Sequence, residues 1–211
     1  MSLFIQSIIN GLNQGAIYAL IALGYTMVYG IIRMINFAHG DFIMVGAYTL
    51  FYTIPLMVAH GMPAWLSVLV AVVICVCVGV AVEIIAYRPV RGAGSMSALI
   101  TALAMSVFLE NLAMVLFGAN PKSVPAIFDL PSIDFLGAKL QCKYLLTIGI
   151  GLLMMLLLQF FVKKTRLGKA MRAVPQDKEA STLMGINVNK IITITFAIGS
   201  GLAAVAALMY C

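Results

Sequence analysis

The chain has 211 residues, of which 63% are hydrophobic and only 9% are charged, and its mean hydropathy is +1.09. Soluble domains carry about 25% charged residues, so this composition excludes an ordinary soluble protein. The net charge of +6 does not indicate nucleic-acid binding, because the basic residues stand in loops beside apolar runs, where they orient a membrane protein. The four cysteines lack the spacing of a metal site or a disulfide framework, and we expect no metal and no cofactor.

Long apolar runs recur along the chain, and each is long enough to cross a hydrocarbon core of about 30 Å. These runs lack the alternating pattern of barrel strands, so helices are the expected spanning elements. We therefore predict an all-α fold, a polytopic transmembrane helical bundle with about six spans, forming a single domain over residues 1–211.

The first predicted span, Ile8 to Ile32, carries a polar stripe. Asn10, Asn13 and Gln14 follow the i, i+3, i+4 spacing of one helix face. Buried amides bond across helices, and polar groups inside a membrane face protein or water. Helix packing explains the stripe, and a second interpretation makes Asn10 and Gln14 part of a translocation path.

A polar turn then separates the first span from a short apolar stretch, Phe42 to Val58. The turn contains Asn36, His39 and Asp41, and we expect Asp41 to cap the helix that follows. The stretch is short, so a broken or re-entrant helix is possible. One histidine and one carboxylate are too few ligands for most metals, although a proton relay remains an alternative. Because discontinuous helices in transporters often mark the substrate route, all three polar residues are path candidates.

The third and fourth predicted spans, Trp65 to Ala86 and Ala98 to Phe117, both contain a carboxylate. Glu83 closes the third span one turn before Arg88, and we expect an ion pair at the membrane surface. Glu110 and Asn111 lie past the middle of the fourth span, where a carboxylate needs a partner or water. Solute contact and structural pairing both remain open for these two residues.

The fifth span, Tyr144 to Val162, and a last apolar run from Ile191 to Cys211 enclose a basic segment. Within this segment, residues 175–184 are predicted to form a short helix of about 15 Å, with a proline at its first position and Gly185 just past its end. The last run stops without a polar tail, so we expect the chain to be a C-terminally incomplete fragment.

The distribution of basic residues predicts the orientation. If residues 163–190 are cytoplasmic and residues 42–58 cross the membrane, ten Lys and Arg residues lie inside and three outside. This asymmetry is the positive-inside bias, and it puts the N-terminus outside.

Four motifs together resemble a known family. They are NFAHGDF (36–42), YRPVR (87–91), LITALAMSVFLEN (99–111) and TRLGKAMRAVPQDKEASTLMGIN (165–187), and they are similar to permeases of branched-chain amino acid ABC importers of the LivH type. The resemblance covers essentially the whole chain. It implies a multi-pass subunit of the bacterial inner membrane that is not an enzyme and that passes leucine, isoleucine and valine. Because family members continue for several further spans, it also implies that this chain is a fragment of a longer permease.

The resemblance also implies partners. These would be two cytoplasmic ABC ATPase subunits, a second permease subunit that is a paralogue, a periplasmic substrate-binding protein and the lipid bilayer, with no nucleic acid. The chain has no phosphate-binding pattern GxxxxGK[ST], so another subunit must hydrolyse ATP. Two alternatives remain: a permease of the same family for urea, amides or other amino acids, and an ion-coupled secondary transporter that uses Glu110, His39 and Asp41.

Within the basic segment, residues 179–185 are similar to the coupling motif of importer permeases, which begins Glu-Ala-Ala and continues to a glycine. Ser181 replaces the second alanine, and the Leu-Pro expected further on is missing. The resemblance implies a cytoplasmic coupling loop at 163–190 that docks on an ATPase through Glu179, Ala180 and Gly185. The alternative is a surface helix held by lipid headgroups through its basic residues.

Overall fold

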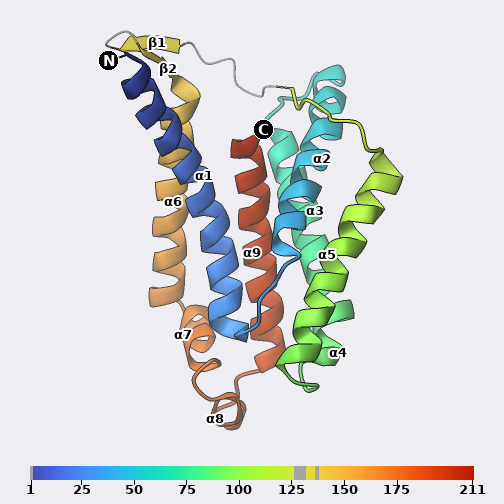
Figure 1. The fold of residues 1–211 in the computed structure, drawn as a ribbon. Helices are drawn as coiled ribbons and strands as arrows, with labels where there is room; N and C mark the ends of the chain where they lie inside the picture. The colour runs from blue at the N-terminus through green and yellow to red at the C-terminus, as the bar shows by residue number, and fades with distance from the viewer. Residues whose placement is uncertain (1, 126–131, 136–137) are drawn as a thin grey trace.

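The computed structural model describes residues 2–125, 132–135 and 138–211. Within these residues, six helices are long and apolar enough to cross a membrane (Figure 1). They are α1 (Ser2–Ile32), α2 (His39–Ala59), α3 (Leu66–Val82), α5 (Ser95–Phe117), α6 (Cys142–Lys164) and α9 (Val188–Tyr210). In the candidate spans, η1 and α4 continue α3, so that the third span extends to Val90. The predicted polytopic helical bundle is confirmed.

Several short elements connect these helices. A π-helical segment, η1 (Glu83–Tyr87), and one helical turn, α4 (Arg88–Val90), follow α3 directly, and α7 (Arg166–Ala173) and α8 (Lys178–Leu183) lie between α6 and α9. Two strands, β1 (Ser132–Phe135) and β2 (Ala138–Gln141), pair antiparallel with Ser132 opposite Gln141. The sequence did not predict this hairpin or α7.

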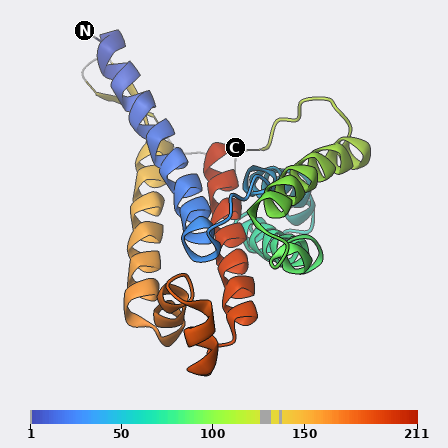
Figure 2. The ribbon, with the colours of Figure 1, turned by 60° about the horizontal axis from the view of Figure 1, so that its bottom comes forward.

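The centre of the bundle is α9, which lies between α1 and α6 on one side and α2, α3 and α5 on the other (Figure 2). Small side chains line its buried face, including Ala203 and Ala207. A Cβ added at Gly46 of α2 would lie 2.9 Å from the Ala207 Cβ, so glycine is what permits this close approach. In contrast, no atom lies within 4 Å of the corresponding positions at Gly11 and Gly15 of α1.

The second span differs from the prediction in two ways. It is one continuous helix despite Pro55, rather than a broken or re-entrant one. The irregular segment 33–38 rises from the lower end of α1, so α2 begins at mid-height inside the bundle (Figure 1). Asp41 is also not the cap: Ala38 occupies the N-cap position, and Asp41 lies within the first turn. The predicted capping role is therefore wrong, because the helix starts earlier than expected.

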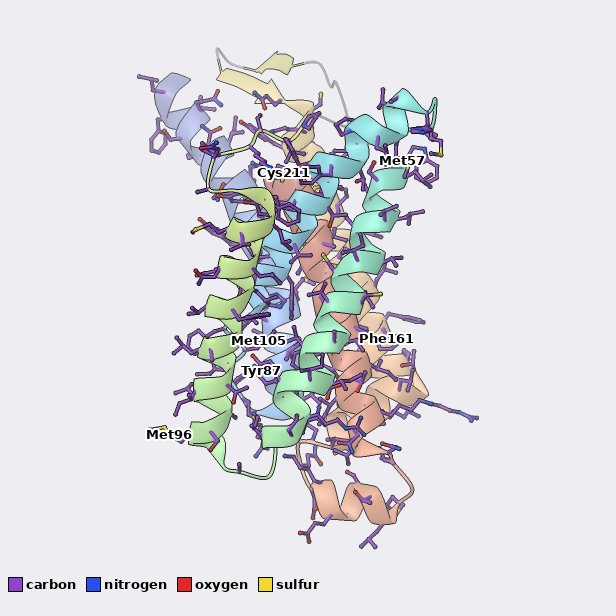
Figure 3. All side chains as sticks on the ribbon, turned by 90° about the vertical axis from the view of Figure 1, so that its right-hand side faces the viewer. Met57, Tyr87, Met96, Met105, Phe161 and Cys211 are labelled. Atoms are coloured by element: carbon purple, nitrogen blue, oxygen red, sulfur yellow. The ribbon has the colours of Figure 1, made fainter. Side chains whose placement is uncertain are left out.

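The two ends of the bundle differ in charge. In Figure 3, Met57 and Cys211 mark the upper end and Met96 marks the lower end, where α4, α7 and α8 also lie. We call the lower end the basic end, because the helix ends and connections there contain Arg33, Arg88, Arg91, Lys163, Lys164, Arg166, Lys169, Arg172, Lys178 and Lys190.

Candidate functional site

A cluster of buried polar side chains surrounds the start of α2. Asn36 is 3% exposed, His39 2%, Asp41 5% and Tyr87 2%. The Tyr87 hydroxyl donates a hydrogen bond of 2.7 Å to Asn36 Oδ1 and so joins η1 to the segment before α2. We refer to residues 36–41 as the polar turn. It lies at a depth where polar groups are otherwise rare in a membrane protein.

The His39 ring is enclosed by neighbouring side chains. Its centroid lies 6.0 Å from that of Tyr25 and 6.2 Å from that of Phe42, both in edge-on arrangements. A Cβ added at Gly24 of α1 would lie 2.8 Å from the His39 Cε1 atom. The absence of a side chain at Gly24 therefore makes room for the ring.

Several atoms of the polar turn are buried without a hydrogen-bond partner among the described residues. They are Asn36 Nδ2, both ring nitrogens of His39 and Asp41 Oδ2. The His39 ring has a polar contact with the Ile21 backbone, but this contact does not meet hydrogen-bond geometry. Most buried polar groups in proteins are bonded, so this set of unbonded atoms distinguishes the polar turn from the rest of the described core.

The structure brings one further predicted path residue to this cluster. Asp41 faces Ser106 and Glu110 of α5, and Glu110 is close enough to act on its charge. Asp41 and Glu110 thus approach each other beside the polar turn, and neither forms an ion pair with a basic side chain among the described residues. In the described ranges, no three His, Cys, Asp or Glu side chains gather as a metal site would require.

The other predicted path residues lie elsewhere. Asn10 accepts a hydrogen bond of 3.1 Å from Gln6 Nε2 of its own helix. At 1.5 Å per residue, Asn10 lies about 21 Å along α1 from Gly24, and Gln14 about 15 Å. Asn111 is exposed and donates to the Val107 carbonyl at 2.7 Å. None of these three belongs to the buried cluster.

A second buried network joins η1 to the beginning of α9. Glu83 is fully buried, forms an ion pair with Arg91, and accepts a hydrogen bond of 2.7 Å from Thr193 Oγ1. Arg91 Nη1 also donates to Asn189 Oδ1 at 2.7 Å. The predicted ion pair of Glu83 is confirmed, but its partner is Arg91 rather than Arg88, and the pair is buried rather than at the membrane surface.

Side-chain caps shape the segment between α6 and α9. The Thr165 hydroxyl accepts from the Gly168 amide at the start of α7, and Asp177 Oδ1 accepts from the Ala180 amide at 2.9 Å at the start of α8. The helix predicted over residues 175–184 is therefore shorter and begins at Lys178, with Pro175 in the turn before it. Its end at Gly185 is as predicted: Gly185 has φ +81°, and the Ile186 amide bonds back to the Ser181 carbonyl at 3.0 Å.

The outer face of α8 carries two large apolar side chains. Leu183 is 88% exposed and Met184 is 82% exposed. They stand at the end of α8, which is not one of the six long helices. Glu179, Ala180 and Gly185 are exposed as well, and Ser181 is buried. We call Leu183 and Met184 the apolar tip. The sequence prediction missed it, because the two residues stand at unspecified positions of the motif.

An irregular segment that leads into a helix beginning inside the bundle, with buried polar side chains beside it, is typical of membrane transport proteins. A family model described as "Branched-chain amino acid transport system / permease component" matches residues 7–211, and the chain belongs to this family.

Curated relatives agree with this assignment. The high-affinity branched-chain amino acid transport system permease protein BraD of Pseudomonas aeruginosa is 39% identical over 215 residues, which cover 98% of this chain and 70% of the relative. The permease proteins LivH of Salmonella typhimurium and Escherichia coli are also 39% identical, with the same coverage. No solved structure matches the chain.

Proposed function

We propose that this chain is the membrane-spanning permease subunit of an ABC importer that passes leucine, isoleucine and valine across the bacterial inner membrane. The observation that carries the proposal is the exposed apolar tip on a capped helix at the basic end. Two adjacent large apolar side chains that are exposed at the end of a short helix support a protein–protein contact there. The positive-inside bias puts this end in the cytoplasm, where the ATPases are.

The coupling loop, residues 163–190, docks on the ATPase through α8. Leu183 and Met184 enter an apolar groove of the ATPase, and Glu179 meets a basic residue there. The polar cap at Asp177 and the glycine at 185 hold α8 in a fixed position for this contact, because they satisfy its free backbone groups at both ends. Glu179, Ala180 and Gly185 are thus the ATPase-coupling residues.

The polar turn and Glu110 line the translocation path. The unbonded atoms of Asn36, His39 and Asp41 support this role, as does the start of α2, whose free amides favour a negatively charged group. A solute amino acid carries both a carboxylate and an ammonium, for which these amides and the Asp41 carboxylate are complementary partners. Asn10, Gln14 and Asn111 stay predictions for other parts of the path.

Partners of four kinds complete the importer: two cytoplasmic ATPase subunits, a second permease subunit that is a paralogue, a periplasmic binding protein and the surrounding bilayer. Two long helices have wide apolar surfaces available for the bilayer or the second permease. Only 6% of the most apolar 18-residue stretch of α6 is buried within the described structure, and only 17% of the corresponding stretch of α5.

The test is leucine uptake into proteoliposomes that contain the chain in its complete importer with the binding protein. We expect ATP-dependent uptake that isoleucine and valine inhibit. Competition by urea or amides alone would identify another solute, and uptake driven by a proton gradient without ATP would contradict the ABC mechanism.

Docking is tested in the same preparation with the variant Leu183→Ser/Met184→Ser. We expect it to weaken binding of the ATPase by about tenfold or more, because central apolar anchors dominate such contacts. Thr182→Ala, which is exposed on the same helix, is the matched control and should leave binding unchanged. Equal binding by both variants would contradict docking through the apolar tip.

A further inference from the structure

A row of polar contacts connects the start of α9 to the polar turn. It begins with Thr193 of α9, whose hydroxyl donates to Glu83 Oε2 at 2.7 Å. It continues along η1 from Glu83 to Tyr87, one turn later, and ends with the bond of 2.7 Å from the Tyr87 hydroxyl to Asn36 Oδ1. The two ends of one five-residue segment, η1, thus contact two different parts of the molecule.

The row starts close to the proposed docking helix. Residues 184–187 connect α8 to α9, and Asn189 in the first turn of α9 accepts a hydrogen bond from Arg91, the ion-pair partner of Glu83. The Tyr87 ring also packs on Phe196 of α9, with centroids 5.3 Å apart. The helix that follows α8 therefore meets η1 and the turn after it through both polar and apolar contacts.

η1 is a π-helical segment that directly continues the α-helix α3. A π-helical turn contains one residue more than an α-helical turn, and such turns are frequent at functional sites. Conversion of η1 to an α-helix would rotate the residues after it by about 100° relative to those before it. Tyr87 and Glu83 could not both keep their partners after such a rotation. Figure 3 places Tyr87 in the lower half of the bundle, above the lower end of α5 at Met96.

We propose that Thr193, Glu83 and Tyr87 form a relay that transmits the displacement of α8 to the polar turn, with η1 as its switching element. This inference rests on the proposed function, because it needs α8 to be displaced by an ATPase. Thr193 and Tyr87 act as positioning residues: they hold Asn36 and the start of α2 in place for the solute. Neither needs to contact the solute itself.

The test uses the complete importer in proteoliposomes, with leucine taken up per ATP hydrolysed as the readout. Thr193→Val and Tyr87→Phe each remove one hydroxyl of the relay. We expect each to lower the ratio by about fivefold or more, which is the usual scale of coupling between sites. Because Thr193 and Tyr87 act one after the other in the same relay, the double variant should lower the ratio no further than the more severe single variant does.

Two further variants separate the relay from a structural role. Thr195→Val removes a buried hydroxyl two residues along α9 that bonds only to the Ile191 carbonyl in the contacts described, at 2.8 Å, and should leave the ratio unchanged. Thr193→Ser keeps the hydroxyl and should restore it. Unchanged ratios in both single variants, multiplied losses in the double variant, or an equal loss in Thr195→Val would each overturn the relay.

A second measurement does not depend on which solute is carried. Hydrogen exchange of residues 36–42 is compared between the nucleotide-free and ATP-bound importer. The relay predicts a nucleotide-dependent change in the parent chain and in Thr195→Val that is lost in Thr193→Val. If the parent chain shows this change but takes up no leucine, the proposed solute is wrong and the relay stands. If the change persists in Thr193→Val, the relay is wrong whatever the solute.

Discussion

At the residue scale, the position of His39 depends on Gly24 of α1, which in turn lies against Gly199 of α9. The missing side chain of Gly24 leaves space for the ring, and a Cβ there would also lie 3.1 Å from the Gly199 carbonyl oxygen of α9. At Gly199 in turn, a Cβ would lie 2.8 Å from a methyl group of Val28 on α1. These glycines therefore fix the contact between α1 and α9 at the depth of the polar turn.

We expect Gly24→Val to destabilise the chain by about 1–3 kcal/mol, because extra side-chain atoms in a packed site force neighbouring groups apart. Thermal unfolding in detergent measures this change. Gly15→Val on the same helix is the control, since no atom lies within 4 Å of its Cβ position. Equal unfolding temperatures for the two variants would mean that the contact between α1 and α9 is looser than described.

Among single residues, the sequence singles out those of the polar turn but not their contact partners. Asn36, His39 and Asp41 stand out because they interrupt apolar runs. Tyr87 and Arg91 belong to the motif YRPVR, but their bonds to Asn36 and Asn189 could not be predicted, because these partners lie far away in the chain. Periodicity is a local property, and it carries no information about such contacts.

At the scale of elements, a single lysine fastens the connection after α5 to α2. Lys122 Nζ donates to the Tyr52 hydroxyl at 2.6 Å and lies 5.2 Å from the centroid of the Phe51 ring. Its amine also faces the rings of Tyr48 and Phe117, which stack at 4.5 Å between α2 and α5. This arrangement combines a hydrogen bond with cation–π attraction.

We expect Lys122→Met to release this connection. Loss of about 1 kcal/mol of cation–π attraction should raise about fivefold the fraction of molecules in which this connection is detached from α2. The reporter is a cysteine at Val124, which packs against the cluster of Leu50, Ile54 and Ala71, and its rate of maleimide labelling measures opening. Lys143→Met is the control. A labelling rate equal to that of the control would show that the apolar packing of Val124 suffices.

The segment between α6 and α9 shows which features of helix ends can be predicted from neighbouring residues and which cannot. The end of α8 at Gly185 was predicted correctly, because glycine readily adopts the positive φ that ends a helix. The start of α8 was predicted at Pro175, which is wrong. Asp177 caps the helix instead, because its carboxylate accepts a hydrogen bond from the Ala180 amide in the first turn. Met171 of α7 and Val174 just after it pack into the hydrophobic core. This packing depends on residues far away in the chain, so the sequence alone did not reveal it.

At the scale of the whole molecule, the number of spans followed from composition, while their arrangement did not. Length and apolar content predict six crossing helices, because the bilayer fixes the length of each. That α9 would lie at the centre is not visible in its pattern, since its alanines and glycines could equally face a partner. The depth at which α2 begins also could not be predicted, because it depends on how the segment 33–38 rises through the bundle.

We propose that α8 faces the cytoplasm and receives the displacement that drives transport. This proposal is tested by labelling Met184→Cys with a membrane-impermeant maleimide, in a chain whose four native cysteines are replaced by alanine. We expect no labelling in spheroplasts, rapid labelling after permeabilisation, and protection when the ATPase is bound. Labelling of Met184→Cys in intact spheroplasts would contradict it.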